Sequence, residues 1–167
     1  MTALPPAPEE VIQEAAGLLD GQALMTLAVN GADGFPWAST VAYVNDGLDL
    51  YFVSARESPR CERLAVDPRA GVAVRSSEDL ADASGLAMTG RVEAVTDAGE
   101  IERINRLVVL RRRDRHAFAA SSHAVAVFRF ITGTISLAKV EAGRSASRRY
   151  RLETSDPPSR TAAADPG

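Results

Sequence analysis

The residues best suited to chemistry are Ser58 and Arg60, where a predicted strand gives way to a helix. Pro59 favours the first position of a helix, so the segment 58–68 predicts a short helix with Ser58 as its N-cap. Free backbone N–H groups at a helix start attract anions, and the Arg60 guanidinium adds a permanent charge matched to phosphate oxygens. The pair therefore predicts a phosphate pocket. The alternative is that Ser58 only caps the helix and Arg60 lies in solvent.

The other reactive residue types favour no catalytic or metal site. His116 and His123 are the only histidines, and neither has a cysteine or carboxylate at the spacing of metal ligands. No pattern of a serine or cysteine nucleophile surrounds them, so no catalytic residue is assigned. Cys61 is the only cysteine and cannot form an internal disulfide. It falls in the predicted helix, where we expect a small buried side chain.

Two segments are rich in arginine. The run RRRDRH (111–116) follows the apolar part of a predicted helix. Cations complement the dipole at a helix C-terminus, which favours a solvated helix end over a contact with nucleic acid or a phosphorylated substrate. The second cluster contains Arg144, Arg148, Arg149 and Arg151.

Short elements joined by tight turns must position these residues. The predicted strands cover 23–30, 37–44, 48–54, 70–75, 85–95 and 124–141, and the predicted helices cover 8–21, 58–68 and the segment from Asp97 to the arginine run. Glycine-containing turns separate the first three strands and leave no room for the crossovers that parallel strands need. Gly133 interrupts the last stretch, which forms one long bent strand or two short ones. The pattern predicts an antiparallel barrel with helices at its edge.

Length and composition favour a single globular domain. The chain has 167 residues, of which 46% are hydrophobic and 25% charged, and its net charge of −3 gives no general reason to expect nucleic acid as a partner. No apolar run approaches the roughly 20 residues that span a bilayer, so we expect a cytoplasmic protein without membrane contact. We predict an N-terminal arm (1–7), a barrel domain (8–142) and a basic segment with a flexible tail (143–167).

Three stretches carry a family resemblance. They are GADGFPWASTVAYVNDGLDLYFVS, SPRCERLAVDPRAGVAV and LAMTGRVEAVTD. In order and spacing they resemble the pyridoxamine 5'-phosphate oxidase-like family of FMN-binding split barrels, roughly over residues 20–140. The resemblance implies a six-stranded antiparallel split β-barrel with peripheral helices, an FMN cofactor and a homodimer that places two cofactors at its interface.

The resemblance also implies which residues bind the cofactor. They are Ala38, Ser39, Thr40, Val41, Ser54, Ser58 and Arg60. The first four belong to the second strand and would lie along the edge of the flavin ring, whereas an ordinary barrel strand is the alternative for them. The hydroxyl of Ser54 would join Ser58 and Arg60 at the phosphate. Phe35 and Trp37 are candidates for stacking on a ring or for core contacts and stay unassigned.

Two departures from the family pattern bear on activity. The family usually has a lysine where this chain has Arg60, and the oxidase carries an arginine on the second strand, where this chain has no basic residue from 35 to 50. The second departure argues against oxidation of pyridoxamine phosphate. We therefore predict an FMN-dependent oxidoreductase with another small-molecule substrate. The alternatives are a deazaflavin-dependent reductase, favoured by the arginine clusters, and a non-catalytic flavin- or haem-binding module, favoured by the departures.

Overall fold

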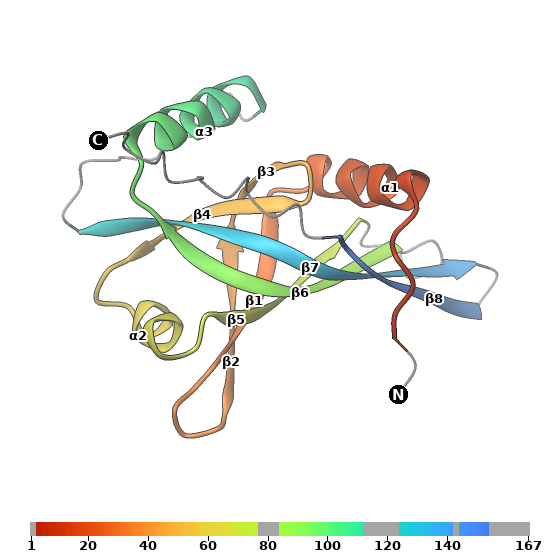
Figure 1. Ribbon diagram of the computed structural model, residues 1–167, viewed down its shortest axis with the longest axis horizontal. Helices are drawn as coiled ribbons and strands as arrows, with labels where there is room; N and C mark the ends of the chain where they lie inside the picture. The colour runs from red at the N-terminus through yellow and green to blue at the C-terminus, as the bar shows by residue number, and fades with distance from the viewer. Residues whose placement is uncertain (1–2, 77–83, 112–123, 142–143, 154–167) are drawn as a thin grey trace, which may run out of the picture.

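One curled antiparallel sheet and three helices make up the described part of the chain (Figure 1). The structure, a computed structural model, describes residues 3–76, 84–111, 124–141 and 144–153. The helices are α1 (Glu9–Asp20), α2 (Pro59–Val66) and α3 (Ala98–Arg111), and the strands are β1 (Leu24–Asn30), β2 (Pro36–Ala42), β3 (Val44–Asp46), β4 (Asp49–Ala55), β5 (Arg69–Arg75), β6 (Ser84–Val95), β7 (Val125–Glu141) and β8 (Arg144–Arg151).

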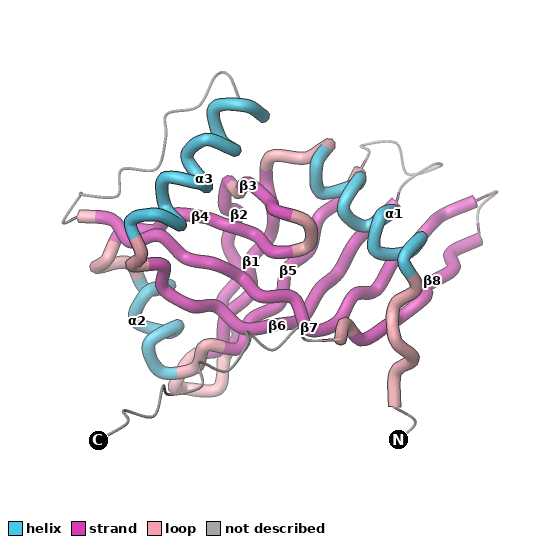
Figure 2. Tube along the Cα trace, turned by 45° about the horizontal axis from the view of Figure 1, so that its top comes forward, coloured by secondary structure: helices cyan, strands magenta, loops and turns pink. Residues whose placement is uncertain are grey.

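The sheet forms the predicted split barrel. Its strands pair in the order β2-β1-β5-β6-β7-β4-β3, and β8 pairs with β7. β2 begins this path and β4 lies near its other end, yet the sheet curls until the two strands come into contact (Figure 2). No backbone ladder joins them, so the barrel stays split between β2 and β4.

The strand count differs from the prediction, since the sheet formed by the described residues has eight strands rather than six. The segment predicted as one strand over 37–44 divides in two. Its first part pairs with β1 up to Ala42, whereas Val44 begins a separate short strand, Val44–Asp46, that pairs with β4 and includes two residues of the predicted NDG turn. The stretch 124–141 forms one long strand rather than two, with an irregular pairing between β6 and β7 at Thr89 and Gly90.

The second added strand is β8, which lies in the basic segment that we predicted without regular structure. Its backbone pairs along the free edge of β7, so strand formation depends on main-chain hydrogen bonds rather than on an apolar pattern. Tyr150 packs against the barrel core. The N-terminal arm joins the same strand, because the amide of Ala7 donates to the carbonyl of Arg151 at 2.9 Å. The predicted flexible tail beyond residue 153 lies outside the described residues.

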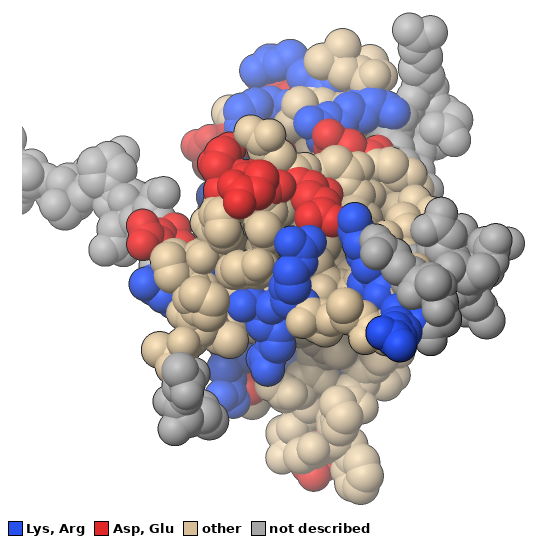
Figure 3. Space-filling view, turned by 90° about the vertical axis from the view of Figure 1, so that its right-hand side faces the viewer, with Lys and Arg blue, Asp and Glu red and all other residues tan. Residues whose placement is uncertain are grey.

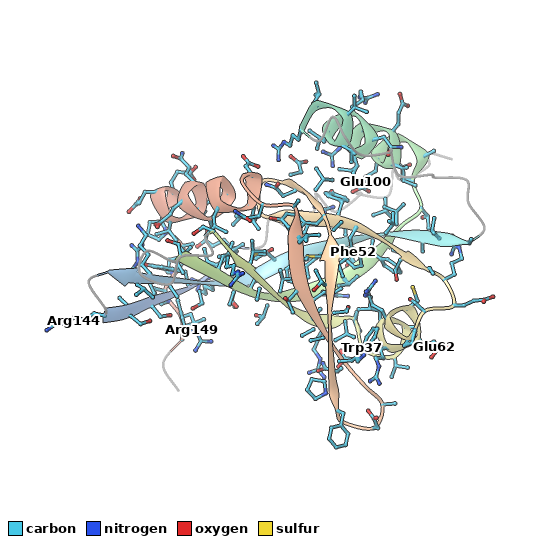
Figure 4. All side chains as sticks on the ribbon, turned by 180° about the vertical axis from the view of Figure 1, so that it is seen from behind. Trp37, Phe52, Glu62, Glu100, Arg144 and Arg149 are labelled. Atoms are coloured by element: carbon cyan, nitrogen blue, oxygen red, sulfur yellow. The ribbon has the colours of Figure 1, made fainter. Side chains whose placement is uncertain are left out.

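Large side chains fill the interior of the barrel. Leu27, Phe52, Met88 and Phe130 are each no more than 2% exposed, and Figure 4 shows Phe52 inside the curled sheet. The apolar stripe of α1 closes one side of this core, as its helical spacing predicted. None of the described helices is long and apolar enough to cross a membrane.

A second, smaller core lies beneath α3. Asp97 caps this helix as predicted, since its carboxylate accepts from the amide of Glu100 at 2.7 Å. Tyr51 lies under the helix, where its hydroxyl donates to Glu100 at 3.0 Å and accepts from Arg103 at 3.1 Å. Burial is the main reason that the pKa of Tyr51 rises to about 12. These contacts tie α3 to the sheet.

The β1–β2 hairpin extends beyond the rest of the barrel beside α2 (Figure 1). Gly34 in its turn has a φ of 82°, a conformation that glycine adopts without strain. The amide of Gly31 donates to the carbonyl of Phe35 at 3.0 Å and closes the loop. The hairpin thus holds the start of β2 over α2.

Candidate functional site

The candidate site lies where α2 meets the split of the barrel. β4 ends at Ala55, and α2 starts after Ser58, whose backbone is extended with φ −79° and ψ 149°. The hydroxyl of Ser58 accepts from the amide of Cys61 at 3.3 Å, and Pro59 occupies the first turn. The predicted cap is therefore confirmed, and the first turn of α2 is directed toward the gap between β2 and β4.

Arg60 bridges this gap. One of its terminal nitrogens donates to the hydroxyl of Ser54 on β4 and the other to the hydroxyl of Ser39 on β2, each at 2.9 Å. The hydroxyls of Ser54 and Ser58 are also 2.9 Å apart. These four residues, named the Arg60 cluster below, bring a guanidinium and three hydroxyl groups together from β2, β4 and α2. Ser54 is 5% exposed, so the cluster lies at the inner end of the gap.

The charge of Arg60 has only neutral partners. Within the described residues, Arg60 takes part in none of the ion pairs. Its Nε is buried without a hydrogen-bond acceptor. Loss of solvent lowers the pKa of the guanidinium. An anion would supply both the missing charge and the missing acceptor, so the residues present fit a phosphate group.

Trp37 and Arg63 also border the cluster, and the sequence assigned neither to it. The Trp37 ring centre is 5.9 Å from the guanidinium carbon of Arg60 and 6.0 Å from that of Arg63. Arg63 lies one helical turn after Arg60, and this spacing could have indicated from the sequence that the two side chains lie on one face of the helix. Its guanidinium also lies 3.7 Å from the carboxylate of Asp33. Phe35 is 73% exposed in the hairpin turn and does not line the cluster.

The four predicted ring-binding residues of β2 divide between two faces of the sheet. Ser39 belongs to the Arg60 cluster, and Val41 is 6% exposed in the core. Ala38 and Thr40 are exposed on the opposite face. A strand has a side-chain period of two, so one flat ring can meet the side chains of only one of these pairs. Their role in ring binding stays a prediction.

The face that carries Ala38 and Thr40 continues across five strands, and we name it the outer face. Strand register places on it Leu24, Thr26, Ala28, Ala38, Thr40, Gly71, Ala73, Gly85, Ala87, Thr89, Thr134, Ser136 and Ala138. These residues are uncharged, and all but Leu24 are small, but the same register places Arg75 opposite Gly85, and Arg69 opposite Arg91, on this face. A hollow of about 340 Å³ lies among them, and its lining includes Thr26, Ala73, Ala87, Ser136 and the charged Arg75. The outer face is an exposed platform that another backbone can approach closely.

The remaining candidates form structural contacts or lie outside the described residues. Arg111 donates to the carboxylate of Asp20 and to the carbonyl of Asn45, each at 2.7 Å, so it fastens α3 to the barrel. The rest of the 111–116 run and both histidines are not among the described residues. Cys61 is half-buried, and its thiol donates to the carbonyl of Ala55 at 3.0 Å. The part of the chain that the structure describes holds no group of three metal-ligating side chains.

The sequence pattern of one family, described as pyridoxamine 5'-phosphate oxidase, matches residues 11–139. This range includes β1–β6, α2, α3 and most of β7, together with the Arg60 cluster. No curated protein sequence matches the chain.

Several solved structures share the fold. A haem-binding protein from Mycobacterium smegmatis has a TM-score of 0.69 and 20% identity; the match covers 84% of this chain but only 58% of that protein. A candidate pyridoxamine 5'-phosphate oxidase from Listeria innocua has a TM-score of 0.62 and 22% identity, with 74% and 94% of the two chains covered. An FAD-binding protein from Mesorhizobium loti has a TM-score of 0.60 and 22% identity, with 75% and 91% covered.

Proposed function

This chain belongs to the pyridoxamine 5'-phosphate oxidase family, and from that premise we propose that it binds FMN, with the phosphate at the Arg60 cluster. One observation carries the proposal: the guanidinium of Arg60 is partly removed from water, has only hydroxyl partners and keeps a buried N–H without an acceptor. A phosphate dianion satisfies each of these needs. The FAD-binding structural neighbour is consistent with a flavin.

The proposed activity is that of an oxidoreductase acting on a small molecule. Bound FMN supplies the hydride chemistry, so the protein needs to hold and orient the cofactor rather than offer an acid–base pair. Arg60 would fix the phosphate, Ser54 and Ser58 would donate to its oxygens, and Trp37 would limit the space beside it. β2 has no basic residue at the position where the oxidase carries its arginine, which supports a substrate other than pyridoxamine phosphate.

Comparison of FMN with riboflavin tests this proposal, since the two differ only in the phosphate. We expect FMN to bind the ligand-free protein at least about tenfold more tightly, as charge-assisted hydrogen bonds to phosphate are lost with riboflavin. Trp37 is the only tryptophan and lies beside Arg60, so quenching of its fluorescence reports on binding near the cluster. Equal affinity for the two flavins would mean that the phosphate does not bind at the Arg60 cluster.

The same titration separates the alternative cofactors. The haem-binding neighbour favours haem as a second candidate, and haem would give its own absorbance bands in place of flavin bands. A deazaflavin should bind more tightly than FMN if the side chains of the arginine clusters bind its longer anionic tail. Failure to bind FMN and riboflavin alike would contradict the flavoprotein proposal.

We further propose that the chain is a homodimer that buries the outer face. The small uncharged side chains in the middle of this face let two sheets pack closely, with Arg69 and Arg75 at the two ends of β5. Ala73 is exposed and lies on β5 near the middle of the face, so Ala73→Arg should place a charge in the interface and yield monomers. Light scattering would measure the mass. Val109→Arg is the control, because Val109 is 59% exposed on α3, and a monomer with this variant would place the interface elsewhere.

A further inference from the structure

A positively charged hollow lies at the other end of the molecule from α2 (Figure 1). It occupies about 400 Å³ and is lined by Leu137 and Lys139 of β7 and by Arg144, Ala146 and Arg148 of β8. Figure 4 shows Arg144 toward the end of the β7–β8 ribbon, away from Trp37 and α2. We name it the basic hollow. No residue of the Arg60 cluster lines it.

The three cations of the basic hollow converge because of strand register. Leu137 pairs with Arg148, Lys139 with Ala146, and Glu141 with Arg144. Paired residues point to the same side of a sheet and alternate residues share a face, so Lys139, Arg144 and Arg148 project to one side of the ribbon. α1 packs on that side, since its Glu14 reaches two of the three. Figure 3 shows basic side chains gathered on this end of the molecule beside acidic ones.

The charges of the basic hollow do not balance. Glu14 contacts two of these cations, with its Oε1 3.2 Å from Lys139 and its Oε2 3.0 Å from Arg148. Although burial raises the pKa of Glu14, its contacts with these two cations lower it overall, so the carboxylate stays charged. Arg144 is exposed and pairs in the ladder with Glu141; among the side chains that the structure describes, it has no ion-pair partner. By strand register Glu141 also belongs to this side, so three cations meet two carboxylates, in a chain whose net charge is negative.

The contacts of Glu14 indicate what kind of ligand fits. One carboxylate, with its two oxygens, already spans Lys139 and Arg148. A phosphate group has more oxygens and more charge, and the planar forks of two arginines match it. The hollow has room for more than one such group. We propose that the basic hollow binds a small anion with two or more phosphate groups, and that Glu14 occupies part of this site when the anion is absent.

Pyrophosphate is the probe that tests the site, measured by isothermal titration calorimetry at low ionic strength. Arg144→Gln should weaken binding about tenfold, because it removes a charged donor to phosphate. Glu14→Gln should strengthen binding about threefold or more, because it removes the internal competitor and one negative charge. Arg106→Gln is the matched control: Arg106 is an exposed arginine on α3, and its loss should change affinity little.

The opposite responses of the two variants distinguish a site from general attraction between a basic surface and an anion. Arg60→Gln should still bind pyrophosphate at the basic hollow, so this result is independent of the proposed flavin site. The proposal is wrong if the wild-type protein binds no pyrophosphate at millimolar concentration, if Arg144→Gln and Arg106→Gln weaken binding equally, or if Glu14→Gln weakens it. Circular dichroism of each variant confirms that the fold is intact.

Discussion

Replacement of Arg60 by glutamine is expected to weaken FMN binding about 100-fold, which corresponds to about 3 kcal/mol. Among the described residues, the guanidinium of Arg60 is the only cation that reaches Ser39 and Ser54, and its two terminal nitrogens are placed to exchange hydroxyl partners for phosphate oxygens. Glutamine keeps a donor but loses the charge. Quenching of flavin and Trp37 fluorescence during titration measures the affinity.

Two controls distinguish the effect of the Arg60 charge on FMN affinity from the effects of its planar shape and of the net charge of the protein. Arg60→Lys keeps the charge but loses the fork, so we expect an affinity between those of the wild type and the glutamine variant. Arg106→Gln changes the net charge equally at a distant helix and should leave FMN affinity unchanged. Riboflavin affinity should not respond to any of the three. If Arg60→Gln binds FMN as tightly as the wild type, the phosphate lies elsewhere.

The phosphate half of the site was predictable because its signal is local. A serine before a proline marks a helix start, and an arginine in the first turn follows directly in the sequence, so Ser58 and Arg60 needed no knowledge of the sheet. Ser54 came from the family resemblance. The contact between Arg60 and Ser39 could not be predicted from the sequence, because it forms only where the curled sheet brings β2 against α2.

The position of Trp37 also could not be predicted from the sequence. Its approach to Arg60 and Arg63 depends on the length of the β1–β2 hairpin and on the angle at which α2 follows β4. Helix spacing alone could have linked the two arginines. The division of Ala38 and Thr40 from Ser39 and Val41, by contrast, follows from strand periodicity and could have been predicted without any structure.

Strands with apolar alternation were predictable, and strands without it were not. β1, β4, β5 and β6 lie within a few residues of their expected positions because one face of each is apolar. β8 carries four arginines among eight residues, and its polar sequence resembles a solvated tail. It forms because β7 is longer than its other neighbours require and leaves an edge to pair with. Such tertiary pairing leaves no local pattern.

Substitution of Gly90 by alanine is expected to lower the free energy of unfolding by at least about 2 kcal/mol and the melting temperature by about 4–8 °C. A Cβ at this position would lie 2.1 Å from the carbonyl oxygen of Ile131 and 3.0 Å from Cζ of Phe130. Neither neighbour can move aside at low cost, because the Ile131 carbonyl belongs to the backbone of β7 and the Phe130 side chain is fully buried. The β6–β7 ladder must therefore shift where its register is already irregular. Denaturant and thermal unfolding measure the loss.

Gly85→Ala on the same strand is the matched control for this loss. A Cβ at Gly85 meets nothing within 4 Å in this chain, so in the Ala73→Arg background, which removes the proposed contact of the outer face, this change should be neutral or raise stability by up to about 1 kcal/mol, since alanine has less backbone freedom to lose on folding. The contrast between two identical substitutions in β6 isolates the close approach of Ile131 from strand propensity. Equal stability of the two variants would mean that β6 and β7 do not pair with this register. The positions of β8 and the basic hollow, and the part of the outer face on β7, would then also be wrong, because they depend on the position of β7.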